Sequence, residues 1–372
     1  MSHSIEQPNS FTWQRAVIKV GSALIAPDGQ GCRTEHLLAL AQFINASRRQ
    51  GKEVVLVSSG AVAAGRNAML ADGKPTLAQK QAMAAVGQTR MMANWARLFD
   101  FPTAQILLTH GDIRDRDRYL NIKSTLRELL AHQILPIVNE NDSVATEELK
   151  FGDNDNLGAL VALVAEADTL MICTDVDGLY DADPRRNPEA RLLRSVQEVS
   201  RDIMALAGGS GSSVGTGGML TKLQAAKKAS ANGIQTLIVN GHETSSYAAL
   251  GQGQVPGTLF HPALSRSKAK KQWLRHSLKA KGKLLIDAGA RQALVTRGAS
   301  LLPVGILSVE GRFAAGDALE IWHDSELLAI GLSLFDADDL ARIKGAQSQQ
   351  VEALLGYASH DVAIHRDDLV LL

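Results

Sequence analysis

Two clusters of carboxylate and amide side chains follow one another in the segment 138–160. The first follows the apolar run 135–138, and the second precedes a helical pattern that begins near residue 157. Open α/β sheets bind their ligands at the carboxyl ends of strands, where the first cluster is expected. The residues of the clusters are Asn139, Glu140, Asn141, Asp142, Asp153, Asn154 and Asp155.

Carboxylates close to a transferred phosphate would repel it, so some of these acids must face lysines, a metal ion or an ammonium group. The ammonium group of an amino acid is a natural partner for Asp142. A solvated loop, with acids that only cap a helix, is the alternative interpretation.

A glycine-rich loop, 208–218, leads into a helical pattern that carries Lys222. Backbone amides at the start of a helix bind phosphate oxygens, and a lysine one turn inside can reach them. The spacing is not that of a Walker A motif, and a flexible linker is the alternative. A second lysine, Lys19, lies at the tip of the strand 16–20, just before Gly21 and Ser22. There it can neutralise phosphoryl oxygens, unless it is simply a solvated charge.

Two further strand ends carry polar residues. Ser58, Ser59 and Gly60 follow an apolar run and predict a tight strand-to-helix turn. Such a turn binds anions, and its serines also suit helix capping. Thr174 and Asp175 end the strand 170–174, ahead of turn signals.

The composition is that of an ordinary globular chain of 372 residues, long enough for two or three domains. Lys plus Arg equals Asp plus Glu at 39 each, so no overall field attracts a polyanion or a membrane surface. Cys32 and Cys173 make neither a disulfide framework nor a zinc-ligand spacing, which fits a reducing compartment. With no signal-like segment and no apolar run of about 18 residues, we expect a cytoplasmic protein.

Short β-branched runs alternate with helical patterns up to residue 259, which predicts an α/β fold with a mostly parallel sheet covered on both faces. The expected strands are 16–20, 53–58, 104–108, 135–138, 170–174 and 236–240. The expected helices are 37–49, 77–99, 120–132, 157–166 and 219–232.

The pattern changes after Pro262. The segment 263–280 is rich in Lys and Arg around Trp273 and reads as a basic linker, with nucleic-acid binding as the alternative. Beyond it, short apolar runs predict a small β-rich domain with one helix at 288–297 and strands near 284–286, 305–309, 318–322, 327–332 and 362–365. We therefore expect a catalytic domain over 1–262 and a second domain over 281–372.

Seven motifs in order, VIKVGSA, VSSGAVAAG, AAVGQ, VNENDSVAT, FGDNDNLGA, TDVDGLY and GTGGMLTK, resemble the glutamate 5-kinases of the amino acid kinase family, followed by a PUA domain. Aspartate, acetylglutamate, uridylate and carbamate kinases share the lysine and the TDVDGLY-like element, whereas the paired NEND and GDNDNL signatures point to the glutamate enzymes. One departure is the Ser22-Ala23 pair where members often carry Thr-Ser; a hydroxyl remains at Ser22. The resemblance implies a three-layer sandwich with a small β-rich PUA-like domain.

The resemblance further implies ATP-dependent phosphorylation of the side-chain carboxylate of L-glutamate to glutamyl 5-phosphate, the first step towards proline. Lys19 and Lys222 would hold the phosphoryl group, and Asp155 would orient these lysines. Glutamate would be bound by Ser59, Asp142 and Asn154. The nucleotide would be bound by Lys19, Thr174, Asp175, Gly215, Thr216, Gly217, Gly218, Met219, Leu220, Thr221 and Lys222.

The implied chemistry explains why no catalytic triad is found. A carboxylate with a pKa near ~4.3 is already ionised at neutral pH and needs no general base. Mg²⁺ would be carried mainly by the ATP phosphates rather than by a protein site. The resemblance also implies a homo-oligomer, a dimer or tetramer, inhibited by proline. RNA binding through the C-terminal domain, or a role of that domain in assembly or regulation, remains an alternative.

Overall fold

The computed structural model describes residues 11–27, 31–69, 74–145, 154–207, 218–265, 280–357 and 360–372. The chain divides into two compact units, one built mainly from residues up to Arg266 and the other mainly from Ser267 to Leu372. Most of the basic segment 263–280 lies outside the described residues. No helix in the described ranges has the length and apolarity needed to cross a bilayer.

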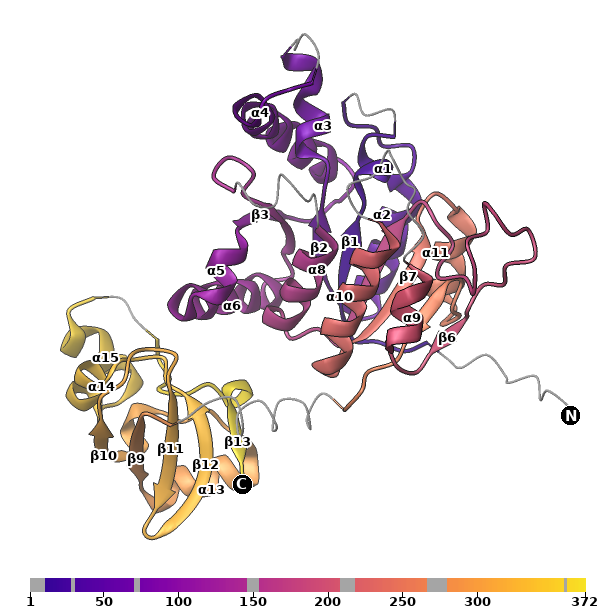
Figure 1. The fold of residues 1–372 in the computed structure, drawn as a ribbon. Helices are drawn as coiled ribbons and strands as arrows, with labels where there is room; N and C mark the ends of the chain where they lie inside the picture. Colours follow the sequence, from indigo (N-terminus) through magenta and orange to yellow (C-terminus); the bar gives the residue numbers. More distant parts are fainter. Residues whose placement is uncertain are drawn as a thin grey trace, which may run out of the picture. The chain divides into compact units, whose positions relative to one another are not determined.

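The first unit is organised around an eight-stranded sheet of order β3-β4-β2-β1-β5-β7-β8-β6 (Figure 1). The strands from β3 to β7 are parallel, β8 runs antiparallel to β7, and β6 pairs with β8 in parallel. Strands β4 and β5 are buried along their whole length, as expected for strands covered on both faces. The bounds are β1 (Arg15–Val20), β2 (Glu53–Ser58), β3 (Thr103–Leu108), β4 (Leu135–Glu140), β5 (Thr169–Thr174), β6 (Ser195–Val196), β7 (Gln235–Asn240) and β8 (Thr258–Phe260).

Helices cover both faces of this sheet, which confirms the predicted three-layer sandwich. Alternate residues of β1 show the division: Ile18 joins the apolar core beneath α2 and α11, whereas the next residue, Lys19, contacts α8 on the other face. The described helices are α1 (Ser22–Ile25), α2 (Leu37–Arg49), α3 (Ala61–Gly65), η1 (Arg66–Ala68), α4 (Leu77–Ala96), α5 (His110–Arg114), α6 (Arg116–Ala131), α8 (Asn154–Val164), α9 (Arg201–Leu206), α10 (Met219–Ala231) and α11 (Thr244–Gly251).

Two boundaries differ from the sequence prediction in a way that matters for the site. Strand β4 extends through Asn139 and Glu140, because these residues pair with Leu107 and Leu108 of β3. Helix α8 begins at Asn154, so Asp155 lies in its first turn rather than ahead of it. The two polar clusters therefore start inside regular elements, which fixes their side chains more firmly than a loop would.

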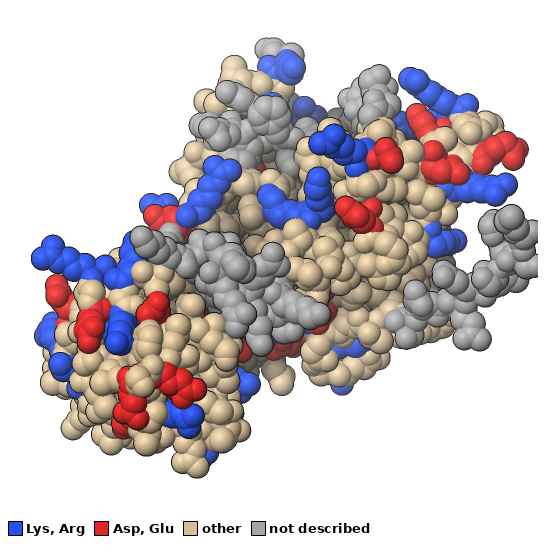
Figure 2. Space-filling model, turned by 60° about the horizontal axis from the view of Figure 1, so that its bottom comes forward, with Lys and Arg blue, Asp and Glu red and all other residues tan. Residues whose placement is uncertain are grey.

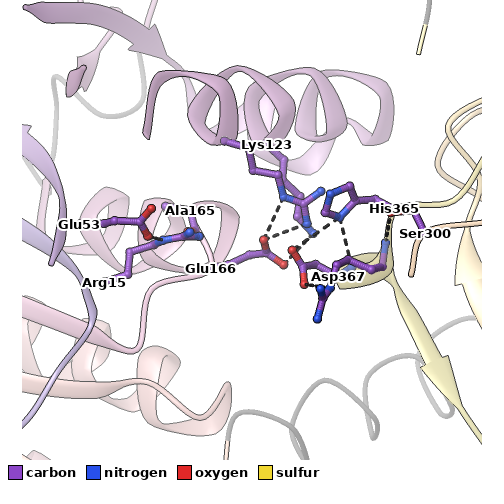
Figure 3. Close-up of polar contacts among 10 residues, drawn as sticks. Arg15, Glu53, Lys123, Ala165, Glu166, Ser300, His365 and Asp367 are labelled. Carbon is purple, nitrogen blue, oxygen red and sulfur yellow. Dashed lines mark hydrogen bonds and ion pairs between the residues drawn. The ribbon is translucent and has the colours of Figure 1, made fainter. Parts of the chain in front are cut away.

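At the opposite, amino-terminal ends of the strands, one ion pair joins β1 to β2 and others join α6 to the end of α8 (Figure 3). Arg15 Nε donates to Glu53 Oε2 at 2.6 Å, and one of its terminal nitrogens donates to the carbonyl oxygen of Ala165 at 2.8 Å. Glu166, just beyond α8, accepts from Arg127 at 2.8 Å and lies 3.3 Å from the ammonium of Lys123. These charged side chains at this end of the sheet are thus paired with one another.

Helices α3 and α4 approach each other backbone to backbone. A Cβ atom added at Gly87 would lie 1.8 Å from the carbonyl oxygen of Ala61, and one added at Gly65 would lie 1.8 Å from that of Met83. Only glycine fits at both positions. The contact anchors α4 beside the turn that follows β2.

We expect Gly87→Ala to lower the free energy of unfolding of the first unit by about 3 kcal/mol, because its methyl group cannot fit without separating α3 from α4. Urea unfolding followed by circular dichroism measures this. Gly251→Ala in α11 is the matched control, since its Cβ would meet nothing within 4 Å, and it is expected to be neutral or slightly stabilising. Equal stability of the two variants would contradict the close contact.

The second unit contains a separate five-stranded sheet of order β10-β9-β11-β12-β13. Its strands are β9 (Gly282–Ile286), β10 (Ile306–Gly311), β11 (Ala318–His323), β12 (Glu326–Leu332) and β13 (Leu369–Leu371), and its helices are α13 (Ala288–Arg297), α14 (Ala337–Ile343) and α15 (Ser348–Leu355), with short turns η2 (Pro303–Gly305) and η3 (Arg366–Asp368). The turn η3 is tied back by the amide of Arg366, which donates to Ser300 Oγ at 3.0 Å (Figure 3).

Two expectations for this unit were wrong. The run 362–365 is not a strand, because only Ile364 pairs there, in an isolated bridge with Leu301, and the strand follows at 369–371. The sequence also predicted one helix, whereas α14 and α15 are present in addition to α13. Both are short, and their buried residues fill the end of the apolar core.

Candidate active site

Two lysines far apart in sequence converge on one carboxylate at the carboxyl end of the central strands. Lys19 Nζ lies 2.6 Å from Asp155 Oδ1, and Lys222 Nζ lies 3.1 Å from Asp155 Oδ2. Thr221 Oγ1 lies 2.8 Å from the same Oδ2. Asp155 is only 1% exposed, and the lysines are 6% and 4% exposed, so the three charges form one buried cluster.

Each member of the cluster comes from a different element. Lys19 is the penultimate residue of β1, Asp155 lies in the first turn of α8, and Lys222 lies in the first turn of α10. Gly158 lets α8 lie close to β1, because a Cβ there would come within 3.3 Å of the Lys19 Cβ. Helix α10 begins after Gly218, and the start of a helix offers backbone amides that have no partner within the helix itself.

The charges set the ionisation of Asp155. Burial by itself raises the pKa of a carboxyl group, but the attraction of Lys19 and Lys222 and the hydrogen bonds from Lys19 and Thr221 outweigh it and hold the pKa of Asp155 well below its ordinary value. The carboxylate is therefore ionised at every physiological pH. It balances two cations whose mutual repulsion would otherwise oppose folding.

A second group, beside the lysines, is a chain of amide and hydroxyl side chains. Asn154 Nδ2 lies 2.9 Å from Ser59 Oγ, 3.2 Å from Asn139 Oδ1 and 3.3 Å from the carbonyl oxygen of Ser58. Asn139 Nδ2 in turn donates to Gln88 Oε1 at 2.9 Å. We call Gln88, Asn139, Asn154 and Ser59 the amide chain.

Ser59 reaches the amide chain through the turn after β2. Gly60 has φ +98°, a left-handed conformation that glycine adopts without strain, and α3 follows at once. Neither serine caps this helix with its side chain. Ser58 Oγ is instead buried, where it accepts from Trp95 Nε1 at 3.0 Å. The capping interpretation is thus wrong, and Ser59 Oγ faces Asn154.

The residues expected at the nucleotide lie at neighbouring strand ends. Thr174 ends β5, next to β1, and its hydroxyl donates to Asp175 Oδ1 at 3.0 Å. Met219, Leu220 and Thr221 form the start of α10 after Gly218. Residues Gly215, Thr216 and Gly217 lie outside the described residues.

Asp142 lies just beyond β4, where the amide of Asn141 is held by the carbonyl oxygen of Leu108 at 2.8 Å. It therefore follows the same strand end that supplies Asn139. Asp153 lies outside the described residues.

Among the described residues, no three His, Cys, Asp or Glu side chains form a group that could hold a metal ion. The two cysteines are both free. Burial raises the pKa of the Cys173 thiol to about 12, so this side chain is a neutral thiol at physiological pH and no nucleophile.

The amino acid kinase family model matches residues 14–240, the part of the chain that holds the lysines, Asp155 and the amide chain. The chain belongs to the amino acid kinase family. A PUA domain model matches residues 282–355, which places a PUA domain after the amino acid kinase domain.

Several curated relatives cover almost the whole of this amino acid kinase. A protein of Idiomarina loihiensis is 52% identical over 97% of this chain and 98% of its own length, and one of Salinibacter ruber is 53% identical over 96% and 97%. One of Xanthomonas campestris is 51% identical over 96% of this chain and all of its own length. Each of the three is named glutamate 5-kinase.

Sequence reasoning missed one member of the amide chain and undervalued another. Asn139 stood in the first cluster but was given no role, and Gln88 appeared only as a letter of the AAVGQ motif. The signal that could have found Gln88 is the glycine before it, since a helix glycine amid good helix formers indicates a close packing contact.

Proposed function

We propose that this amino acid kinase transfers the γ-phosphoryl group of ATP to the side-chain carboxylate of L-glutamate, giving glutamyl 5-phosphate, the first step of proline biosynthesis. The observation that carries the proposal is the convergence of Lys19 and Lys222 on Asp155. The near-complete coverage by relatives named glutamate 5-kinase supports the choice of acceptor.

The two lysines supply the charge that the reaction needs. During transfer, negative charge is spread over the phosphoryl oxygens between the acceptor and the leaving oxygen. Lys19, from β1, and Lys222, from the start of α10, present their ammonium groups to these oxygens, and Asp155 holds the two ammonium groups close together. The acceptor carboxylate is already ionised, so alignment and neutralisation account for catalysis.

The acceptor amino acid is held both by a hydrogen-bond donor and by groups that accept hydrogen bonds. Ser59 offers a hydroxyl, while Asp142 and the side-chain oxygen of Asn154 suit an ammonium group. Glutamate carries a carboxylate and an ammonium group at the end remote from the reacting carboxylate, so these residues bind it at that end. The transferred group then meets the reacting carboxylate beside the lysines.

The nucleotide is bound by the segment 215–222 and by Thr174 and Asp175. The start of α10 provides amide N–H groups suited to phosphate oxygens. Mg²⁺ would be carried mainly by the ATP phosphates, where it would neutralise part of their charge.

The test is ADP release from Mg-ATP in the presence of single acidic amino acids. We expect turnover with L-glutamate and little or none with L-aspartate or N-acetyl-L-glutamate, which differ in chain length or lack the free amine. Release that is faster with either of the latter would refute the acceptor assignment. Adding proline to the same assay tests the proposed feedback inhibition, which would appear as a higher Michaelis constant for glutamate or a lower turnover.

We further propose a cytoplasmic homo-oligomer, a dimer or tetramer, whose PUA domain serves assembly or regulation. Light scattering of the full chain, compared with residues 1–262, tests the oligomer: a monomer in both cases would contradict it. A dimer or tetramer of the full chain that is lost on truncation would assign assembly to the PUA domain.

RNA is the second candidate ligand of the PUA domain, supported by the family match and by the basic segment 263–280. Phosphate contacts dominate nucleic-acid affinity, yet residues 281–372 carry eight Lys and Arg against thirteen Asp and Glu. Red and blue side chains are interspersed on the face drawn in Figure 2. This excess of acidic residues in the domain argues against RNA as its ligand. Salt-sensitive binding of RNA by the full chain would instead support RNA binding.

A further inference from the structure

The amide chain has a direction, because an amide offers donors on nitrogen and acceptors on oxygen. The two N–H groups of Asn154 point inward, towards Ser59 Oγ, Asn139 Oδ1 and the Ser58 carbonyl oxygen. The Asn139 amide repeats this direction by donating to Gln88 Oε1. We call Ser59, Asp142 and Asn154, the proposed glutamate-binding residues, the acceptor pocket. Asn139 accepts from Asn154 of this pocket and donates to Gln88, which ends the chain.

The position of Gln88 at the end of the amide chain is fixed by burial and by helix packing. It is 8% exposed on the buried face of α4, and it follows Gly87, whose backbone contact with α3 fixes the helix. Its Oε1 accepts from Asn139, while its buried Nε2 has no acceptor within the described part of the chain. Turning the amide over would set two N–H donors against each other, so Asn139 is held in one orientation.

We propose that Gln88 is a positioning residue that gives the acceptor pocket its preference for an amino group. The proposal rests on the proposed function, since it concerns how glutamate is recognised. With Gln88 Oε1 at the far end, Asn139 turns its own oxygen towards Asn154. Asn139 Oδ1, Ser59 Oγ and the Ser58 carbonyl oxygen together use the N–H groups of Asn154 inside the protein, and its oxygen remains as an acceptor for the substrate ammonium group.

The same direction decides what Ser59 offers. Because Ser59 Oγ accepts from Asn154, its hydroxyl hydrogen is available to donate, which suits a carboxylate. If Asn139 loses its acceptor, its amide can adopt either orientation. In the reversed one, its N–H groups face those of Asn154, which the Ser58 carbonyl oxygen keeps inward. The two sets of donors repel each other, so Asn154 is displaced and its oxygen no longer meets the ammonium group, while the hydroxyl of Ser59 still suits a carboxylate.

Comparing two ligands isolates this effect. Glutamate carries the ammonium group, and glutarate is the same dicarboxylate without it. Gln88→Met keeps the length of the side chain but removes the acceptor. We expect its glutamate affinity to fall about tenfold, as for the loss of one hydrogen bond to a charged ligand, with glutarate affinity unchanged. Isothermal titration of both ligands with the full-length protein measures the glutamate-to-glutarate ratio, which is the affinity for glutamate divided by the affinity for glutarate.

The matched control is Gln81→Met, two turns earlier on α4 and outside the amide chain, which should leave both affinities unchanged. Gln88→Glu is the rescue variant, because a carboxyl oxygen faces Asn139 in either protonation state, and the glutamate-to-glutarate ratio should not fall. It also carries the test if Gln88→Met does not fold, as judged by circular dichroism.

A second arm asks whether Gln88 acts through Asn139. In an Asn139→Ala background, Gln88→Met should cause no further loss of glutamate affinity, since the link is already removed. The proposal would be overturned if Gln88→Met weakened the binding of glutamate and glutarate equally, so that the ratio of affinities stayed unchanged. A fall in this ratio in Gln88→Glu, or additive losses of glutamate affinity in the double variant, would also overturn it. If the wild-type protein fails to phosphorylate glutamate, the proposed function fails separately.

Discussion

Replacing Lys222 by alanine is expected to lower kcat roughly 10³-fold while changing the Michaelis constant for glutamate less than about threefold. Lys222 Nζ lies 3.1 Å from Asp155 Oδ2 in the buried cluster, where its charge is poorly screened by water. The phosphoryl oxygens gain most charge in the transition state, so the missing ammonium group is felt there more than in the bound substrates. Steady-state ADP release at saturating ATP measures both constants.

Lys227→Ala is the matched control, because Lys227 is exposed on the same helix and its loss should leave kcat unchanged. Circular dichroism checks that the Lys222 variant is folded. A loss that appears mainly in the Michaelis constant for glutamate would show that Lys222 binds the acceptor instead of the group in transfer. A comparable loss in both variants would point to an effect of helix charge.

Replacing Asp155 by asparagine is expected to lower both stability and turnover. The change preserves shape but leaves Lys19 and Lys222, each less than 10% exposed, without their shared carboxylate. Removing one partner of a buried ion pair costs about 3–5 kcal/mol of unfolding free energy. Because ATP phosphates restore negative charge between the lysines, Mg-ATP should recover part of this loss, and thermal unfolding with and without nucleotide measures it.

Asp317→Asn is the control for Asp155→Asn, since Asp317 is also buried and pairs with a lysine, Lys281 at 3.0 Å, but belongs to the second unit. It should leave kcat unchanged. An Asp155→Asn protein with wild-type stability and turnover would refute the bridging role of Asp155.

The pH dependence of stability gives a further check on Asp155. The folded protein holds the pKa of Asp155 below its ordinary value, so the stabilisation is complete above the unfolded pKa near ~4 and declines as the pH falls below it. The difference in stability between the wild type and Asp155→Asn should therefore be constant at neutral pH and shrink in acid. A difference that grows in acid would have the wrong sign.

Much of the fold follows from local pattern, because a covered parallel sheet needs continuous apolar strands. The strand at 53–58 and the helices at 37–49 and 288–297 begin and end where the sequence predicts. The end of β4 could not be predicted, since Asn139 and Glu140 have polar side chains and are held in the strand by pairing with β3. Strand pairing is a property of the neighbour and leaves no mark in the residues themselves.

Some residues of the candidate site could likewise be predicted from local sequence, and others could not. Lys19 and Lys222 could be predicted, because a strand tip and a glycine-rich helix start are recognisable locally. Asp155 could be singled out only as one of several acids of which some must face lysines, and its role as the partner of these two lysines came from the resemblance to known kinases. The role of Gln88 could not be read from sequence, since it depends on the approach of α3 to α4 and on which way three amides are turned.

The contact between Gly65, Gly87 and the facing carbonyl oxygens has a mechanical consequence. With no side chains between them, α3 and α4 have no room to slide or tilt separately, and they move as one stiff lever. Helix α4 has 20 residues, a span of about 30 Å. Any displacement of the turn at Ser59 would therefore carry the whole of α4 with it.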